Sequence, residues 1–176
     1  MNLSGKQFVQ SDLVEQVMSS LLQTKLPPQY LTLEITESVV MVNPEAAINM
    51  LRRLKELGVK LNIDDFGTGY SSLSYLQQFP VDTMKIDRSF VSRMTESPEN
   101  MEIVKTIIEL AHNLKMNVTA EGIETADQLS QLKGLECENA QGYFLSRPVD
   151  SKSATEMLRK VLGMEKACLL YTSRCV

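Results

Sequence analysis

Short apolar runs with a period of two residues alternate along the chain with amphipathic runs of helical period. The period-two runs predict strands at residues 30–35, 59–63, 83–86 and 117–120, and a shorter strand at 136–140. The amphipathic runs predict helices at residues 44–57, 72–79, 99–115, 126–132 and 153–162. This repeated order of strand then helix, with short connections, predicts parallel strands joined by right-handed crossovers.

Polar residues recur just after the centre of each predicted strand: Glu34, Asp64, Asp65, Lys85, Asp87, Glu121 and Gln141. In a (β/α)8 barrel the C-terminal strand ends carry the active site, whereas a doubly wound open sheet gathers its ligand groups at one switch point. Polar groups at five successive strand ends therefore predict an α/β fold, specifically a modified (β/α)8 barrel of the TIM type.

Five strands are clear, and residues 1–4 could form the end of a sixth. A closed barrel of this type needs eight strands. We therefore expect the barrel to be incomplete at the N-terminus, with the sequence beginning inside its domain and that domain occupying residues 1–162.

The composition is that of an ordinary globular domain, with 43% hydrophobic and 23% charged residues. The net charge of −4 offers no basic field for a DNA or RNA polymer. The single histidine, His112, argues against histidine-rich metal hydrolases and against Ser-His or Cys-His catalysis. Cys137, Cys168 and Cys175 have no metal-ligand spacing. Without a membrane-spanning apolar run or a basic-then-apolar leader, a cytoplasmic location is expected.

Two adjacent carboxylates, Asp64 and Asp65, follow an apolar strand and precede Gly67 and Gly69. Neighbouring residues of a strand point to opposite faces, so the pair is a poor core feature. Where a strand gives way to a loop at a barrel mouth, both side chains can turn toward one site and offer hard oxygen ligands to Mg²⁺ or Mn²⁺. An Asx turn followed by a helix cap is the alternative interpretation of Asp near Gly and Ser.

The C-terminal residues 163–176 form a tail, and residues 168–176 break the preceding pattern. The codons TAC ACA TCT encode Tyr-Thr-Ser, and their reverse complement encodes Arg-Cys-Val, the last three residues. We interpret residues 168–176 as a non-native sequence from a transposon end used in sequencing libraries. Sequencing of the coding DNA checks this prediction, since codons incompatible with an inverted repeat would contradict it.

Several motifs occur in a fixed order: Asn2-Leu3-Ser4, Leu33-Glu34-Ile35-Thr36-Glu37, Asp64-Asp65-Phe66-Gly67-Thr68-Gly69-Tyr70, Lys85-Ile86-Asp87, Ala120-Glu121-Gly122-Ile123-Glu124 and Gln141-Gly142-Tyr143. Together they make the chain resemble the EAL-domain family of cyclic di-GMP phosphodiesterases over about residues 1–162. The resemblance implies a modified (β/α)8 barrel that hydrolyses cyclic di-GMP to linear pGpG with two Mg²⁺ or Mn²⁺ ions.

The resemblance also implies roles for individual residues. Lys85 matches the catalytic lysine that orients or helps to activate the nucleophilic water, and Gln141 matches a polar group near that water and the substrate. Glu37 and Glu124 match residues that stabilise the loop over the metals and couple it to a dimer interface. The implied metal ligands are Asn2, Glu34, Asp64, Asp65, Asp87 and Glu121. From the residues alone, Asn2 could equally be a frayed terminus or a helix cap, and Lys85 and Asp87 could form an ion pair.

The Glu-Ala-Leu segment that names the family is absent from this sequence. With it are missing a glutamate metal ligand, an arginine that contacts substrate phosphate, and the first barrel elements. We therefore expect little or no turnover by this chain alone. An inactive cyclic di-GMP receptor or protein-interaction module is the alternative function. The family also implies a homodimer, and an upstream sensory or cyclase domain that could tether the parent protein to a membrane.

Overall fold

A computed structural model of the chain describes residues 1–69 and 72–162, with the side chains described as far as Arg159. Tyr70, Ser71 and residues 163–176, including the segment predicted to be non-native, lie outside the described residues. Among the described helices, none is long and apolar enough to cross a membrane.

The described residues form a parallel sheet of five strands in the order β1-β2-β3-β4-β5. The strands are β1 (Thr32–Thr36), β2 (Lys60–Phe66), β3 (Thr83–Ile86), β4 (Asn117–Ala120) and β5 (Asn139–Ala140). Each strand joins the sheet beside its predecessor on the same side, and right-handed crossovers then place the connecting helices on one face. A doubly wound sheet would reverse its order at a switch point. The predicted α/β fold and incomplete barrel are therefore confirmed.

The first residues of the chain pair with β1 as the end of a further strand. The Leu3 N–H donates to the Glu34 carbonyl at 2.8 Å, and the Glu34 N–H donates to the Met1 carbonyl at 2.8 Å. Asn2 forms the corresponding parallel bridge with Glu34. The predicted sixth strand end is therefore present and lies beside β1.

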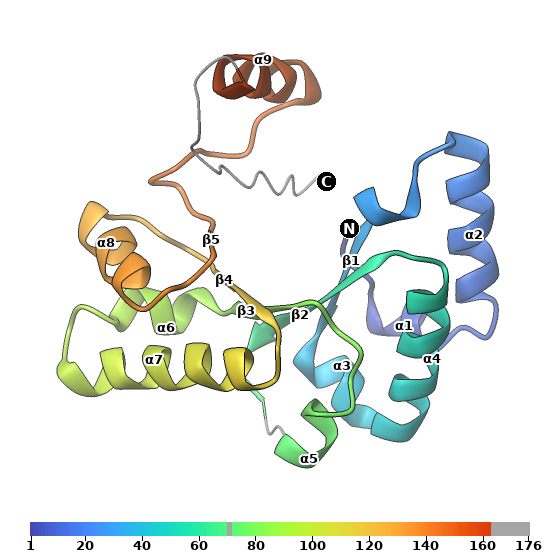
Figure 1. Ribbon diagram of the computed structural model, residues 1–176, viewed down its shortest axis with the longest axis horizontal. Helices are drawn as coiled ribbons and strands as arrows, with labels where there is room; N and C mark the ends of the chain where they lie inside the picture. Colours follow the sequence, from blue (N-terminus) through green and yellow to red (C-terminus); the bar gives the residue numbers. More distant parts are fainter. Residues whose placement is uncertain (70–71, 163–176) are drawn as a thin grey trace.

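Helices follow the strands in the expected alternation. In chain order they are α1 (Gly5–Phe8), α2 (Leu13–Thr24), the 3₁₀ helix η1 (Pro28–Tyr30), α3 (Glu37–Val42), α4 (Pro44–Glu56), α5 (Leu73–Leu76), α6 (Arg88–Arg93), α7 (Pro98–Asn113), α8 (Ala126–Gly134) and α9 (Ser151–Leu162). Figure 1 shows α4 and α7 beside the sheet and α9 set apart at the end of the described chain. Side chains of Asn43, Ser97 and Thr125 accept N–H bonds and fix where α4, α7 and α8 begin.

Two predicted strands begin later than expected. The strand predicted at 30–35 starts at Thr32, because the N–H groups of Tyr30 and Leu31 bond back to the Pro27 and Pro28 carbonyls in η1. The strand predicted at 136–140 shrinks to β5, because Glu136 has a left-handed φ of 60° and ends the turn that follows α8. Local turn geometry overrides the apolar pattern at both places.

The strand predicted at 59–63 also differs, because β2 runs from Lys60 to Phe66 and so includes both aspartates. The other main differences concern helices. The helix predicted at 72–79 is the four-residue α5. The helices α1, α2, α3 and α6 were not predicted. Both α3 and α6 are short and start directly at a strand end, so they carry too few residues to show a helical period.

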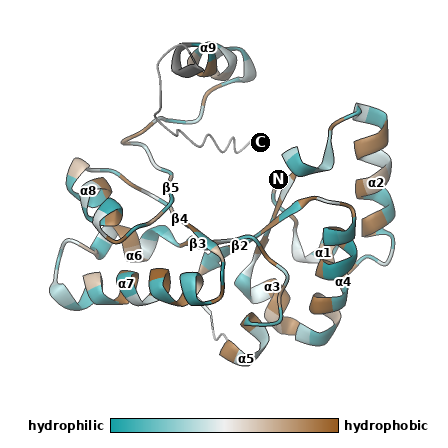
Figure 2. Cartoon of the chain, in the orientation of Figure 1, coloured by the Kyte–Doolittle hydropathy of each residue, from teal (hydrophilic) through white to brown (hydrophobic). Residues whose placement is uncertain are grey.

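The two faces of the sheet differ in chemistry. One set of alternating strand residues is buried and apolar: Leu33, Ile35, Leu61, Ile63, Met84, Ile86, Val118 and Ala120. The other set, which shares the opposite face, is polar: Glu34, Asn62, Asp64, Lys85 and Thr119. Figure 2 shows the helices carrying both hydrophobic and hydrophilic residues, as helices that cover an apolar sheet face must. The polar face corresponds to the interior of the barrel.

Replacement of Leu61 by Ala should destabilise the fold strongly, because Leu61 is fully buried near the start of β2. The expected loss is about 2–5 kcal/mol of unfolding free energy, from lost burial and the cavity left behind. Leu22→Ala is the matched control, because Leu22 is 72% exposed on α2; it should change stability by about 0.5 kcal/mol or less. Urea titration measures both, and equal losses would contradict this packing of the core.

Candidate metal centre and active site

A β-bulge in β2 brings the two adjacent aspartates to the same site. Ile63 pairs with Met84 and Phe66 pairs with Ile86, so Asp64 and Asp65 lie opposite the single residue Lys85. Asp65 has a left-handed φ of 53°, which breaks the alternation of a regular strand. Its backbone N–H donates to Asp64 Oδ1 at 3.1 Å. The bulge therefore turns both carboxylates to the polar face, which a regular strand could not do.

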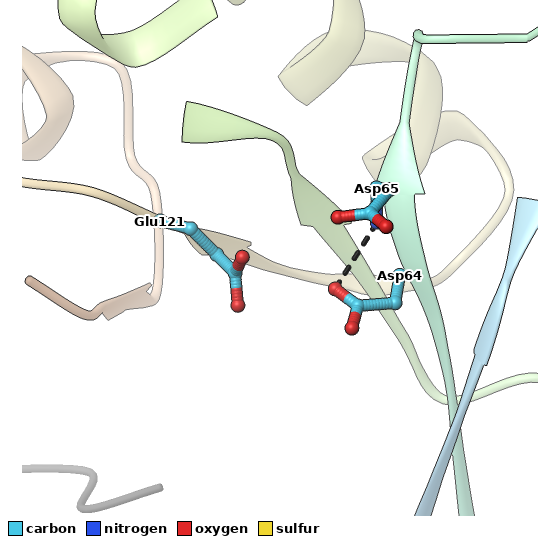
Figure 3. A group of neighbouring side chains, drawn as sticks. All are labelled: Asp64, Asp65 and Glu121. Atoms are coloured by element: carbon cyan, nitrogen blue, oxygen red, sulfur yellow. Dashed lines mark hydrogen bonds between the residues drawn. The ribbon is translucent and has the colours of Figure 1, made fainter. Parts of the chain in front are cut away.

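Asp64, Asp65 and Glu121 form a cluster of three carboxylates. One oxygen from each lies within 4.8 Å of the others. Figure 3 shows the aspartates from β2 and Glu121 from the end of β4 pointing toward one another. Asp64 and Glu121 are buried and Asp65 is partly buried. The carboxyl ends of two strands that are not neighbours thus converge on one point.

Lys85, on the intervening strand β3, places a positive charge beside this cluster. Its Nζ lies 2.7 Å from Glu121 Oε1, 3.0 Å from Asp64 Oδ1 and 3.2 Å from Glu34 Oε2. The lysine side chain is 4% exposed. One buried ammonium therefore serves three carboxylates from β1, β2 and the end of β4.

The electrostatics of the cluster follow from burial and proximity. Burial alone lowers the pKa of Lys85, but the nearby carboxylates, Glu121 foremost, outweigh burial and raise the pKa above its ordinary value. Burial raises the pKa of the Glu121 carboxyl, and the Lys85 charge opposes that effect. Lys85 therefore carries its charge throughout the neutral range. Elsewhere, burial raises the pKa of the Cys137 thiol to about 11, which makes it unsuited to nucleophilic chemistry at neutral pH.

Glu37 holds the loop that follows the bulge. Its side chain is buried at the start of α3, and its Oε2 accepts the Gly67 N–H at 2.8 Å. A Cβ at Gly69 would lie 3.1 Å from Glu37 Oε1, so the loop backbone closely approaches this carboxylate at a second point. Phe66, expected to anchor the loop, is buried. Glu37 thus contacts the loop backbone, and its loop-stabilising role stays a prediction.

The other predicted site residues take different positions. Asn2 lies beside Glu34 through its backbone bridge. Asp87 accepts the Ser89 N–H at 2.9 Å and caps α6. Gln141 follows β5, and its Oε1 is buried without a hydrogen-bond partner among the described residues. Glu124 is exposed, and its backbone N–H donates to Gln128 at the start of α8. The three-carboxylate cluster contains neither Asn2 nor Asp87.

The donor set fits a divalent cation. Asp64, Asp65 and Glu121 supply hard anionic oxygens from a compact group, the ligand type that Mg²⁺ and Mn²⁺ prefer. The unpartnered Oε1 of Gln141 is a further polar atom that a ligand could satisfy. Metal binding here would need Lys85 to share its carboxylate partners with the ion.

The bulge and the helix α6 were not predicted from the sequence. The bulge has a signal, since two polar residues in succession interrupt the alternation between Ile63 and Phe66. The helix α6 has no comparable signal, because its six residues are too few to show a helical period.

Comparison with known proteins places the chain in a family. The family model of the EAL domain matches residues 1–148. The chain belongs to the EAL domain family. Among its relatives, Cyclic di-GMP phosphodiesterase NbdA of Pseudomonas aeruginosa is 45% identical over 158 residues, which cover 90% of this chain and 20% of NbdA.

Solved structures of EAL proteins agree. The EAL domain of Mycobacterium smegmatis DcpA is 42% identical with a TM-score of 0.85, covering 90% of this chain and 71% of that one. The PaMucR phosphodiesterase in its c-di-GMP complex is 40% identical with a TM-score of 0.84, covering 87% of this chain and 62% of that one. The chain therefore spans a fifth of the length of NbdA and about two thirds of these EAL structures.

Replacement of Lys85 by Met should destabilise the protein in the presence of chelator, because three carboxylates would lose their shared buried counter-charge. The expected loss at neutral pH is about 3–5 kcal/mol of unfolding free energy. Lys105→Met is the matched control, since Lys105 pairs with Glu102 and Glu109 on the exposed face of α7; its loss should be about 1 kcal/mol or less. Denaturant titration compares them, and equal losses would refute the counter-ion role of Lys85.

Proposed function

We propose that this EAL domain belongs to a metal-dependent phosphodiesterase that hydrolyses cyclic di-GMP to linear pGpG. The observation that carries the proposal is the convergence of Asp64, Asp65 and Glu121 next to the buried Lys85. The name of NbdA and the PaMucR complex support cyclic di-GMP as the substrate class. Hydrolysis adds water across one of the two phosphodiester bonds and opens the ring.

The carboxylates would hold the catalytic ions. We assign Asp64, Asp65, Glu121 and Glu34 to two Mg²⁺ or Mn²⁺ ions, with Asn2 and Asp87 as further ligands. When bound, such ions supply charge neutralisation at the phosphodiester and activate water. The positive charge of the ions would matter because the chain has a net charge of −4 and the proposed substrate carries two anionic phosphodiesters.

Lys85 and Gln141 would act on the reacting groups. The Lys85 ammonium, already held by carboxylates from three sides, is positioned to orient the attacking water and to stabilise negative charge on the phosphate. The buried Oε1 of Gln141 can accept a hydrogen bond from that water or from substrate. Glu37 keeps the adjoining loop in place, and we assign Glu124 a supporting role in the same region.

The proposal extends to the oligomeric state, the neighbouring domains and the location of the protein. A homodimer formed through the EAL domain, an upstream sensory or cyclase domain, and a cytoplasmic location all stay predictions. NbdA is about five times as long as its matched region, which shows that an EAL domain can be one part of a larger signalling protein.

We expect metal-dependent turnover from a version of the chain extended upstream at its genomic locus and trimmed of residues 168–176. Conversion of cyclic di-GMP to pGpG would be followed with Mn²⁺ and with chelator, alongside the trimmed chain without the extension. Turnover should require Mn²⁺ and should be near zero without the extension. Asp64→Asn should lower kcat/KM at least about 100-fold. Loss of a direct metal ligand should cost no less than loss of a residue that only orients a ligand, which costs up to about 100-fold.

Asp127→Asn is the matched control, because Asp127 is exposed in the first turn of α8 and should leave turnover unchanged. Binding of cyclic di-GMP without turnover in the extended version would favour the receptor function instead. Full activity of the trimmed, unextended chain would contradict the need for upstream barrel elements.

A further inference from the structure

The short helix α6 touches the loops that follow the strands on both sides of it. It begins directly after β3, where the Asp87 side chain caps its first turn. On one side lies the loop after β2, and on the other the loop after β4. These loops adjoin Asp65 and Glu121, two members of the carboxylate cluster.

Gly67 is packed against the ring of Phe90 in α6. Gly67 has a φ of +96°, and a Cβ added there would lie 2.7 Å from Phe90 Cε2 and 2.9 Å from Cζ. Side chains do not normally approach this closely, so only glycine lets the ring reach the loop backbone. Asp65 stands two residues before this contact.

Gly122 is packed against Arg88, the first residue of the same helix. Gly122 has a φ of +73°, and a Cβ added there would overlap the Arg88 Cβ and lie 3.3 Å from the Arg88 Cα. Glu121 immediately precedes this contact. The helix is also tied to α8, because Gln128 Nε2 donates to the Val91 carbonyl at 3.3 Å in a buried position.

We propose that α6 acts as a spacer that sets the separation of the Asp65 and Glu121 carboxylates, with Phe90 and Arg88 as positioning residues for the metal centre. The inference rests on the proposed function, in which these carboxylates hold a divalent cation. Asp65 lies in a bulge, where the strand ladder is interrupted, so contacts outside the ladder contribute to holding its backbone.

The separation of the two carboxylates affects metal affinity. Mg²⁺ requires near-ideal octahedral geometry with short ligand distances, so a small shift of one carboxylate weakens binding. Residues that orient metal ligands commonly change metal affinity by about 10–100-fold when replaced. Phe90 and Arg88 would act through the two glycine contacts.

The test is Mn²⁺ affinity of the upstream-extended protein, measured by electron paramagnetic resonance of free Mn²⁺ and without any assay of turnover. Gly67→Ala should weaken Mn²⁺ binding about tenfold. Gly58→Ala is the matched control, because Gly58 has a similar φ of +85° but its nearest neighbour, Pro28 Cβ, would lie 3.5 Å from the new methyl group. Both variants incur left-handed backbone strain, but only Gly67→Ala meets the Phe90 ring.

A compensating change sharpens the test. Phe90→Leu removes the ring atoms that the new methyl group would strike, so the double variant Gly67→Ala/Phe90→Leu should bind Mn²⁺ more tightly than Gly67→Ala. Phe90→Leu alone should weaken binding several-fold, because the loop loses its support. If Gly67→Ala does not fold, Phe90→Leu decides: weakened Mn²⁺ binding supports the spacer, and unchanged binding overturns it.

The outcomes separate this inference from the proposed function. If the unaltered protein fails to bind Mn²⁺, the proposed metal centre falls and the spacer falls with it. If the unaltered protein binds Mn²⁺ and Gly67→Ala binds it as well as Gly58→Ala does, only the spacer is overturned. Weaker binding by Gly67→Ala and by Phe90→Leu but not by Gly58→Ala, with tighter binding by the double variant than by Gly67→Ala, supports it.

Discussion

The ion pairs of Lys85 are the interaction on which the polar face of this barrel depends. Carboxylates from β1, β2 and the end of β4 meet there, and their mutual repulsion in a buried setting would oppose folding. One lysine on the strand between them offsets that repulsion without filling the site with apolar side chains. The same arrangement leaves anionic oxygens close together, where a cation could bind. Lys85 therefore both stabilises the fold and keeps the carboxylates in place for that site.

The rest of the architecture serves this convergence. Parallel strands added in one direction place their carboxyl ends along one rim, and the helices cover the apolar face. The bulge in β2 adds what a regular strand cannot, two neighbouring carboxylates on one side. Glu37 and α6 then hold the loop after the bulge from two directions. Function at this rim therefore depends on backbone positions set by groups outside the cluster.

The proposed hydrolysis of cyclic di-GMP fits these features because that molecule would bring negative charge to an acidic chain. Such a site needs cations to mediate the encounter and a fixed ammonium to assist the reaction, and the donor set provides places for both. Kinship with NbdA and with the EAL domain of DcpA agrees with this assignment of the family.

Much of this was accessible from the sequence alone. Apolar periodicity identified the five strands and their order of alternation with helices, because burial on one face requires a repeating pattern. Position at the ends of predicted strands identified a set of polar residues as candidates for one site: Glu34, Asp64, Asp65, Lys85 and Glu121. Tertiary structure alone decided how they meet: the bulge, the three-way pairing of Lys85, the cap made by Asp87 and the packing of Phe90 on Gly67. The bulge depends on a single left-handed residue, and the cap is a short local contact from Asp87 to Ser89. The other two features join residues distant in sequence, so none of the four leaves a periodic signal in the chain.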